Sequence, residues 1–165
     1  MDLKGQISIE FMFLVGFAVT VTLLVFSYAL DANELNIAMT AARSGALEGT
    51  NINSFAVYSE ITFKEYEIEK PRLLYTSNIK IVKIDYKNQG FSNVYKKTKI
   101  MLIIYASTPM LSSYADKNSL GDRINYNTRK SITDSFKTHN LTNALYNPAF
   151  SNNYVFTTAD VKWVY

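Results

Sequence analysis

The chain opens with an apolar segment that predicts an α-helix long enough to cross a membrane. Between Phe11 and Leu30, a run of twenty residues, no charged residue occurs. An α-helix rises about 1.5 Å per residue, so this run can span a hydrocarbon core about 30 Å thick. The hydroxyl groups in this run add little to the free-energy cost of placing it in lipid, because each can bond a backbone carbonyl one turn earlier. The pattern predicts a hydrophobic stem over residues 6–30, which must lie in lipid or in a bundle of its own kind.

The helical pattern continues beyond the stem but becomes amphipathic. Over residues 31–50, spacings of three and four place one set of residues on a single face: Leu35, Ala38, Met39, Ala42, Ala46 and Gly49. Polar residues occupy the other side: Asn33, Asn36, Thr40 and Arg43. Alanine and glycine on the apolar face would let a sheet or another helix approach closely. Gly45, Gly49 and the Asn51/Asn53 pair mark the predicted end, which gives one helix about 65 Å long from Gln6 to Gly49.

After residue 50 the pattern changes to the two-residue alternation of β-strands. Lys87–Gly90 is a turn signal that separates two of the predicted strands. The continuously apolar segment Ile100–Tyr105 predicts a central strand. The predicted strand segments are Phe55–Ile68 with a bulge near Lys64–Glu65, Leu73–Tyr86 with a phase slip near Ile81–Val82, Ile100–Tyr105, and Val161–Tyr165.

Between the central and the terminal strand, residues 108–153 are rich in Asn, Ser and Tyr. We expect long loops there and one short helix, marked by Ile132, Phe136, Leu141 and Leu145. The predicted fold class is therefore α+β, with a long N-terminal helix packed on an antiparallel β-sheet head. We predict a leader over residues 1–5, a helix over residues 6–50 and a β-rich head over residues 51–165.

Charge is uneven along the chain, which carries a net charge of +3. The leader has one acid and one base, residues 6–50 have four acids and one base, and residues 51–165 have fifteen bases and nine acids. The basic residues of the head are interspersed with carboxylates and form no clustered stripe, so we expect no nucleic-acid partner. With no cysteine and one histidine, we also expect no zinc site, no disulfide and no cofactor.

The sequence holds no pattern typical of a catalytic site. His139, the only histidine, lies in a polar, loop-like stretch, where surface placement is expected. No Gly-rich phosphate loop or nucleophile elbow occurs. Four glutamates alternate with other residues as on the solvated face of a strand, which is not the arrangement of a hydrolytic pair: Glu60, Glu65, Glu67 and Glu69. We therefore expect that the protein is not an enzyme.

Three interpretations of the N-terminus remain open from the residues alone. A secretory signal peptide would be cut after the small-x-small triplet Ser27–Ala29, although the apolar run is long for such a peptide. A simple signal anchor would hold Lys4 on the cytoplasmic side. In the anchor, Glu10 could reach the headgroups, whereas an acid directly beside the apolar segment is unusual for a signal peptide.

The third interpretation rests on a resemblance. The sequence Lys4-Gly5-Gln6-Ile7-Ser8-Ile9-Glu10-Phe11 resembles the class III signal peptide of archaeal type IV pilin-like proteins, in which a base and a glycine precede Gln-x-Ser-x-Glu. The resemblance covers about thirty residues, and the head shows no family motif. It implies that a prepilin-peptidase-like protease, recognising Lys4 and Ser8, cuts between Gly5 and Gln6. The Gly-rich, Thr-containing helix opening of an archaeal flagellin is not present.

The resemblance further implies a structural subunit of a type IV pilus-like surface filament. Such a subunit would sit in the cell membrane before assembly and then polymerise with itself or other pilins, its head exposed outside for adhesion. Cutting before Gln6 would create an α-amino cation one turn from Glu10, with which Glu10 of the same or a neighbouring subunit could pair and set axial register. Gly16 and Thr20 form a small-xxx-small pair suited to close helix contact, or are ordinary apolar-helix composition.

Two other features carry weaker expectations. Asn140-Leu141-Thr142 is the only sequon for N-glycosylation, so Asn140 is a candidate acceptor. Eleven of the twelve tyrosines follow residue 50, and we expect most of them to pack in the sheet. The alternative is an adhesive surface. Two further functions remain open: a membrane-anchored surface binding protein that never polymerises, and a secreted enzyme released after Ala29.

Overall fold

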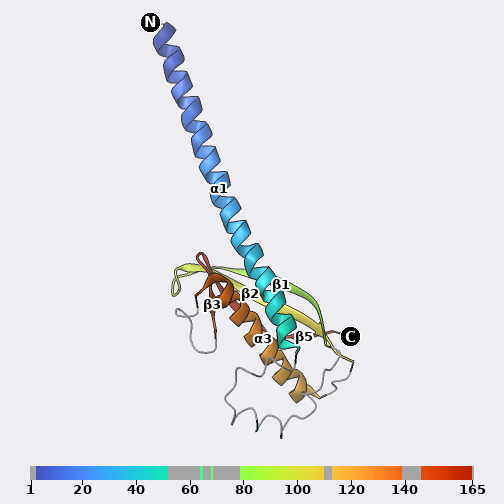
Figure 1. Cartoon of the computed structure of the whole chain (residues 1–165). Coiled ribbons are helices and arrows are strands. Elements are labelled where there is room, and N and C mark those ends of the chain that lie inside the picture. Colours follow the sequence, from blue (N-terminus) through green and yellow to red (C-terminus); the bar gives the residue numbers. More distant parts are fainter. Residues whose placement is uncertain are drawn as a thin grey trace. The chain divides into compact units, whose positions relative to one another are not determined.

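The computed structural model describes the backbone of residues 3–51, 64, 68, 79–109, 113–138 and 146–164, with side chains from Ile9 onward. The first element is the helix α1, which runs from Leu3 to Gly49 (Figure 1). The chain divides into two compact units, Met1–Asn36 and Ile37–Tyr165. The first unit consists of the N-terminal part of α1. The predicted continuous helix through the stem is therefore confirmed.

The part of α1 within the second unit buries the predicted small-residue face. Ala38, Ala42 and Ala46 are fully buried, and Gly49 is buried as well, whereas Thr40 and Arg43 on the opposite side are exposed. The helix ends with bonds from the backbone N–H groups of Thr50 and Asn51 to the carbonyls of Leu47 and Glu48. These three-residue steps satisfy carbonyls that have no intrahelical partner.

Within the described residues of the second unit, five strands form one mixed sheet. The strands are β1 (Lys80–Ser92), β2 (Lys97–Ser107), β3 (Ala149–Phe150), β4 (Tyr154–Thr158) and β5 (Lys162–Trp163). Their order is β1-β2-β4-β3, and β5 also pairs with β2. The β1–β2 and β3–β4 pairs are antiparallel, whereas β4 and β5 run parallel to β2. The predicted central strand is thus confirmed as β2, which has neighbours on both sides, and the predicted terminal strand is reduced to β5.

Irregularities in β1 explain one correct prediction and one error. The register shift between Ile81 and Lys83 is the predicted phase slip. The predicted turn at Lys87–Gly90 is wrong, because β1 continues through it with a second register shift between Asn88 and Phe91. The Asn88 side chain accepts a bond from the Gly90 N–H at 2.8 Å, and Gly90 has a φ of 82°. Turn-forming residues here make a bulge, and the chain reverses at residues 93–96.

The helix α3 runs from Tyr114 to Phe136 and is much longer than the short helix expected in this region. Its fully buried apolar residues are Leu120, Ile124 and Ile132, but the same face also buries Asn127 and Thr128. The Asn127 amide donates to the Arg123 carbonyl at 3.0 Å and the Thr128 hydroxyl to the Ile124 carbonyl at 2.8 Å. These local bonds pair the Asn127 Nδ2 and the Thr128 hydroxyl, whereas the buried Asn127 Oδ1 has no partner among the described residues. Polar residues on the buried face concealed the helical period in the sequence.

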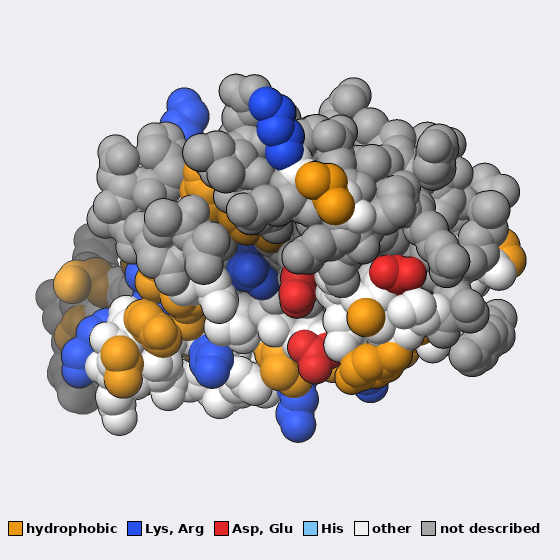
Figure 2. All heavy atoms as spheres, turned by 90° about the horizontal axis from the view of Figure 1, so that it is seen from below, with side chains coloured by type: hydrophobic (Ala, Val, Ile, Leu, Met, Phe, Trp, Pro, Cys, Tyr) orange, Lys and Arg blue, Asp and Glu red, His pale blue; other side chains and the backbone are white. Residues whose placement is uncertain are grey.

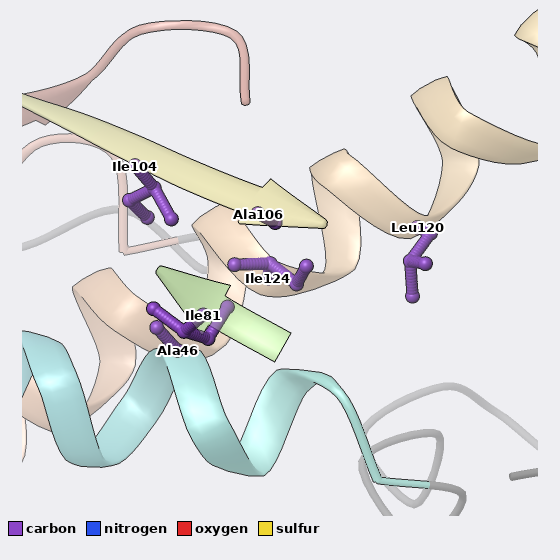
Figure 3. Close-up of a cluster of buried hydrophobic side chains, with 6 residues drawn as sticks. All are labelled: Ala46, Ile81, Ile104, Ala106, Leu120 and Ile124. Atoms are coloured by element: carbon purple, nitrogen blue, oxygen red, sulfur yellow. The ribbon is translucent and has the colours of Figure 1, made fainter. Parts of the chain in front are cut away.

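One hydrophobic cluster joins the sheet to both helices within the second unit (Figure 3). From Ile100 onward the even-numbered residues of β2 are buried, Ile104 and Ala106 among them, whereas the odd-numbered residues on the other face are half-buried. The cluster consists of Ala46 from α1, Ile81 from β1, Ile104 and Ala106 from β2, and Leu120 and Ile124 from α3. The α+β class with a helix packed against a sheet is confirmed.

Part of the predicted strand Phe55–Ile68 can be tested. Lys64 and Ile68 have helical backbone, which contradicts a strand at these two positions. The rest of that segment, residues 73–78 of the next predicted strand, and Leu141 and Leu145 lie outside the described residues. The predicted boundaries of the leader, helix and head stay predictions.

Candidate membrane and assembly helix

The stem presents apolar side chains on every side. All residues from Ile9 to Asn33 are exposed, among them Phe13 at 76% and Leu24 at 67% of the full accessible area of the residue. By length and composition the helix can cross a membrane, and its most apolar stretch has no buried residue. It is therefore unlike the buried core helix of a soluble protein. A signal sequence near the N-terminus meets the same criterion, so the length and composition of the helix fit both a membrane-spanning helix and a signal sequence.

Hydroxyl groups in the stem satisfy themselves within the helix, as predicted. Thr20 donates to the Gly16 carbonyl at 2.8 Å, Thr22 to Ala18 at 2.8 Å, and Ser27 to Leu23 at 3.0 Å. Each bond spans one helical turn. The polar atoms of these residues are paired before any contact with lipid or another chain, which lowers the cost of placing the stem in an apolar environment.

The residues of the predicted processing site lie on one continuous helical backbone. Lys4, Gly5, Gln6 and Ser8 belong to α1, and their side chains are outside the described part of the structure. Glu10 is exposed at the start of the apolar run, and Gly16 is exposed with no atom within 4 Å of where a Cβ would lie. Among the described residues, none makes a close contact at Gly16, so the small-xxx-small interpretation stays a prediction about other chains.

The other end of α1 is packed tightly against α3 in the second unit. A Cβ on Gly45 would lie 2.3 Å from the Asn127 carbonyl oxygen, and one on Gly49 would lie 2.7 Å from the Ile124 Cα. The buried Arg123 side chain donates through Nε to the Gly49 carbonyl at 2.6 Å. A cation at a helix C-terminus also complements the helix dipole. These contacts hold the last turns of α1 in the head.

Lysines and one tyrosine gather on the sheet face away from the helices. Lys83 pairs with Asp85 at 2.7 Å and lies 4.4 Å from the centre of the Tyr105 ring, and Lys162 lies 5.4 Å from the same ring. The bond to Asp85 raises the pKa of Lys83 above its ordinary value. Lys83 and Lys162 are far apart in the sequence, and the sheet alone brings them together.

On α3, burial lowers the pKa of Arg129, which donates to the Thr158 hydroxyl.

A polar hollow of about 140 Å³ lies between the first half of α3 and the segment that leads into β5. It is lined from α3 by Tyr114, Lys117, Asn118, Gly121, Asp122 and Asn125, and from the other side by Asp160, Val161 and Trp163. Sequence analysis missed this site. The lining residues from α3 follow the i, i+3, i+4, i+7 spacing of one helix face, which could have indicated the site. That spacing points to a shared face only if the whole of α3 is predicted as a helix.

Seen from below, the described surface places Asp and Glu side chains next to hydrophobic ones, with Lys and Arg around them (Figure 2). Within the described residues, no three His, Cys, Asp or Glu side chains form a group that could hold a metal ion. His139 and Asn140 lie outside those residues. The tyrosines are divided: Tyr105, Tyr126 and Tyr154 are half-buried, whereas Tyr114 is 79% exposed.

Comparison with known proteins adds no assignment. No protein-family profile matches this chain, and neither the curated proteins nor the solved structures contain a significant match to it.

Proposed function

We propose that this chain is a pilin-like structural subunit, trimmed before Gln6 and assembled into a surface filament through its apolar stem. The observation that carries the proposal is the exposed apolar helix with an acid at its start. Exposed aliphatic and aromatic side chains contribute about 1.5–3 kcal/mol each when they are fully buried. A stem that has many of them is stable in lipid and can later pack with identical stems.

Glu10 supports assembly rather than simple anchoring. Trimming before Gln6 would place a new α-amino cation one helical turn from Glu10, near the positive end of the helix dipole. A charge left without a partner in an apolar bundle costs about 3–5 kcal/mol. Stems would therefore align at the height where the amine of one subunit meets the carboxylate of another. The head would then occupy the exterior or the tip of the filament and make surface contacts.

N-terminal sequencing of the mature protein from its native membrane tests the proposal. We expect the mature chain to begin at Gln6, and we expect Gly5→Val to remain untrimmed because the resemblance places Gly5 directly before the cut, within the recognised motif. Gly16→Ala, outside the motif, serves as the control and should be trimmed normally.

Two other results would replace the proposal. An intact or Met-trimmed N-terminus would identify a membrane-anchored binding protein that does not polymerise. A start at Leu30 would identify a secreted protein released after Ala29. Normal trimming of Gly5→Val would count against recognition of the motif.

A further inference from the structure

We infer that the hollow between α3 and β5 binds a neutral saccharide unit. This inference goes beyond the proposed function, because it concerns the head alone and holds whether or not the chain polymerises. The hollow of about 140 Å³ is smaller than the sites of about 300–1,000 Å³ that enclose drug-sized ligands. Its size therefore suits one ring of a larger molecule, such as the terminal unit of a glycan.

The side chains of the hollow match the two kinds of surface on a sugar ring. Trp163 is half-buried against the core and lines the hollow, where its large ring can cover the C–H face of a hexose. Asp122 and Asp160 are exposed carboxylates on opposite walls, and they accept bonds from hydroxyl donors. Few ligands other than polyols combine an apolar face with several hydroxyl donors.

Asn125 joins the two walls of the hollow. It is 6% exposed, and its Nδ2 donates to the Ala159 carbonyl at 3.0 Å, which fixes the orientation of the amide. This bond ties α3 to the segment before β5, so the two walls of the hollow are held together.

Gly121 explains how the hollow stays open within a helix. Glycine is unfavourable in a helix interior, and Gly45 and Gly49 are justified by backbone contacts that no Cβ could tolerate. No such contact requires glycine at position 121, because a Cβ added to Gly121 would lie 3.4 Å from the Val161 Cβ, at ordinary contact distance. The missing side chain instead leaves space between two residues that both line the hollow.

The charge of the hollow selects the class of sugar. The lining contains two carboxylates, Asp122 and Asp160, and one ammonium group, Lys117, so its net charge is negative. Repulsion disfavours uronic and other acidic sugars as well as phosphate groups. A neutral hexose is therefore the expected occupant.

Trp163 is the only tryptophan of the chain, so its fluorescence reports directly on the hollow. The full chain, held in a detergent without a sugar headgroup, is titrated with the methyl glycosides of glucose, galactose, mannose and N-acetylglucosamine, and with methyl glucuronide. We expect a saturable change with at least one neutral glycoside and weaker binding of the glucuronide.

Matched variants separate binding from folding. Asp160→Ala and Gly121→Ala should each weaken binding at least tenfold, while Asp134→Ala, an exposed acid on α3 outside the hollow, should leave binding unchanged. Gly121→Ala should unfold at the same or a higher temperature, because alanine favours the helix. The inference is overturned if no neutral glycoside gives a saturable signal, if the hollow variants bind like the unmodified chain, or if the glucuronide binds most tightly.

Discussion

At the scale of single residues, polar groups inside the head act by satisfying backbone atoms. Arg123 is 3% exposed, and its Nε bonds the Gly49 carbonyl at the end of α1. Asn127 and Thr128 bond carbonyls one turn earlier in α3. The sequence shows that these residues are polar, but not that they are inside. Burial depends on distant parts of the chain: the partner of Arg123, Gly49, lies more than seventy residues earlier.

Arg123→Met tests this role. The substitution keeps most of the apolar length of the side chain but removes the donor to Gly49. Because a buried hydrogen bond from a charged group contributes about 1.5–3 kcal/mol, we expect the free energy of unfolding of the head to fall by about that amount. Urea denaturation of the detergent-held chain measures it. Arg43→Met, at an exposed position of α1, should change it by about 0.5 kcal/mol or less. Equal losses in the two variants would contradict the role of the Gly49 bond.

At the scale of elements, α1 has two parts with different requirements. Residues 9–32 expose apolar side chains all round, whereas the segment that includes Ala38, Ala42 and Ala46 buries one narrow face. Gly45 and Gly49 let α1 and α3 meet backbone to backbone. The amphipathic pattern predicted the buried face correctly, because burial on one side of a helix leaves a 3.6-residue period.

Gly45→Ala should separate these two helices. The new Cβ would lie 2.3 Å from the Asn127 carbonyl oxygen and cannot be accommodated without a backbone shift. Overpacking of this kind costs about 1–3 kcal/mol, so the head should unfold at a lower temperature in a thermal scan. Gly16→Ala, whose Cβ would meet nothing within 4 Å in this chain, should leave the transition in place. An unchanged transition in Gly45→Ala would show that the helices are not closely packed in solution.

At the scale of the whole molecule, the proposed function gives the stem and the head separate tasks, and the chain also divides by charge. Acids outnumber bases over residues 6–50, and bases outnumber acids over residues 51–165. The proposed filament would bury the stem and its single early acid, Glu10, and leave the sheet and the hollow to the environment.

Glu10→Ala tests the proposed register at this scale. We expect the variant to insert into the membrane and to be trimmed at Gln6, but its amount in sheared filaments should fall at least tenfold, because the amine of Gln6 would lose its partner. Quantitative immunoblotting of the membrane and filament fractions measures this ratio. Glu48→Ala, an exposed acid near the other end of α1, is the matched control and should be incorporated normally. Normal incorporation of Glu10→Ala would remove the assembly role of this acid.

The sequence by itself determined the elements whose signal is local. The apolar run of the stem, the amphipathic face of α1, the central strand β2 and the slip near Ile81 all follow from periodicity along one segment. The candidate processing site at Gly5 and Gln6 also rests on a local motif, and it stays a prediction.

Tertiary structure decided the features that depend on distant partners. The turn residues of Lys87–Gly90 form a bulge because β2 continues to pair with β1 on both sides of it. The length of α3 was hidden because its buried face includes the polar residues Asn127 and Thr128, and only packing in the folded head places that face inside. The hollow unites α3 with Asp160 and Trp163, and no local pattern joins residues that are forty positions apart. Local periodicity records which face of an element is buried, but only folding sets which faces meet.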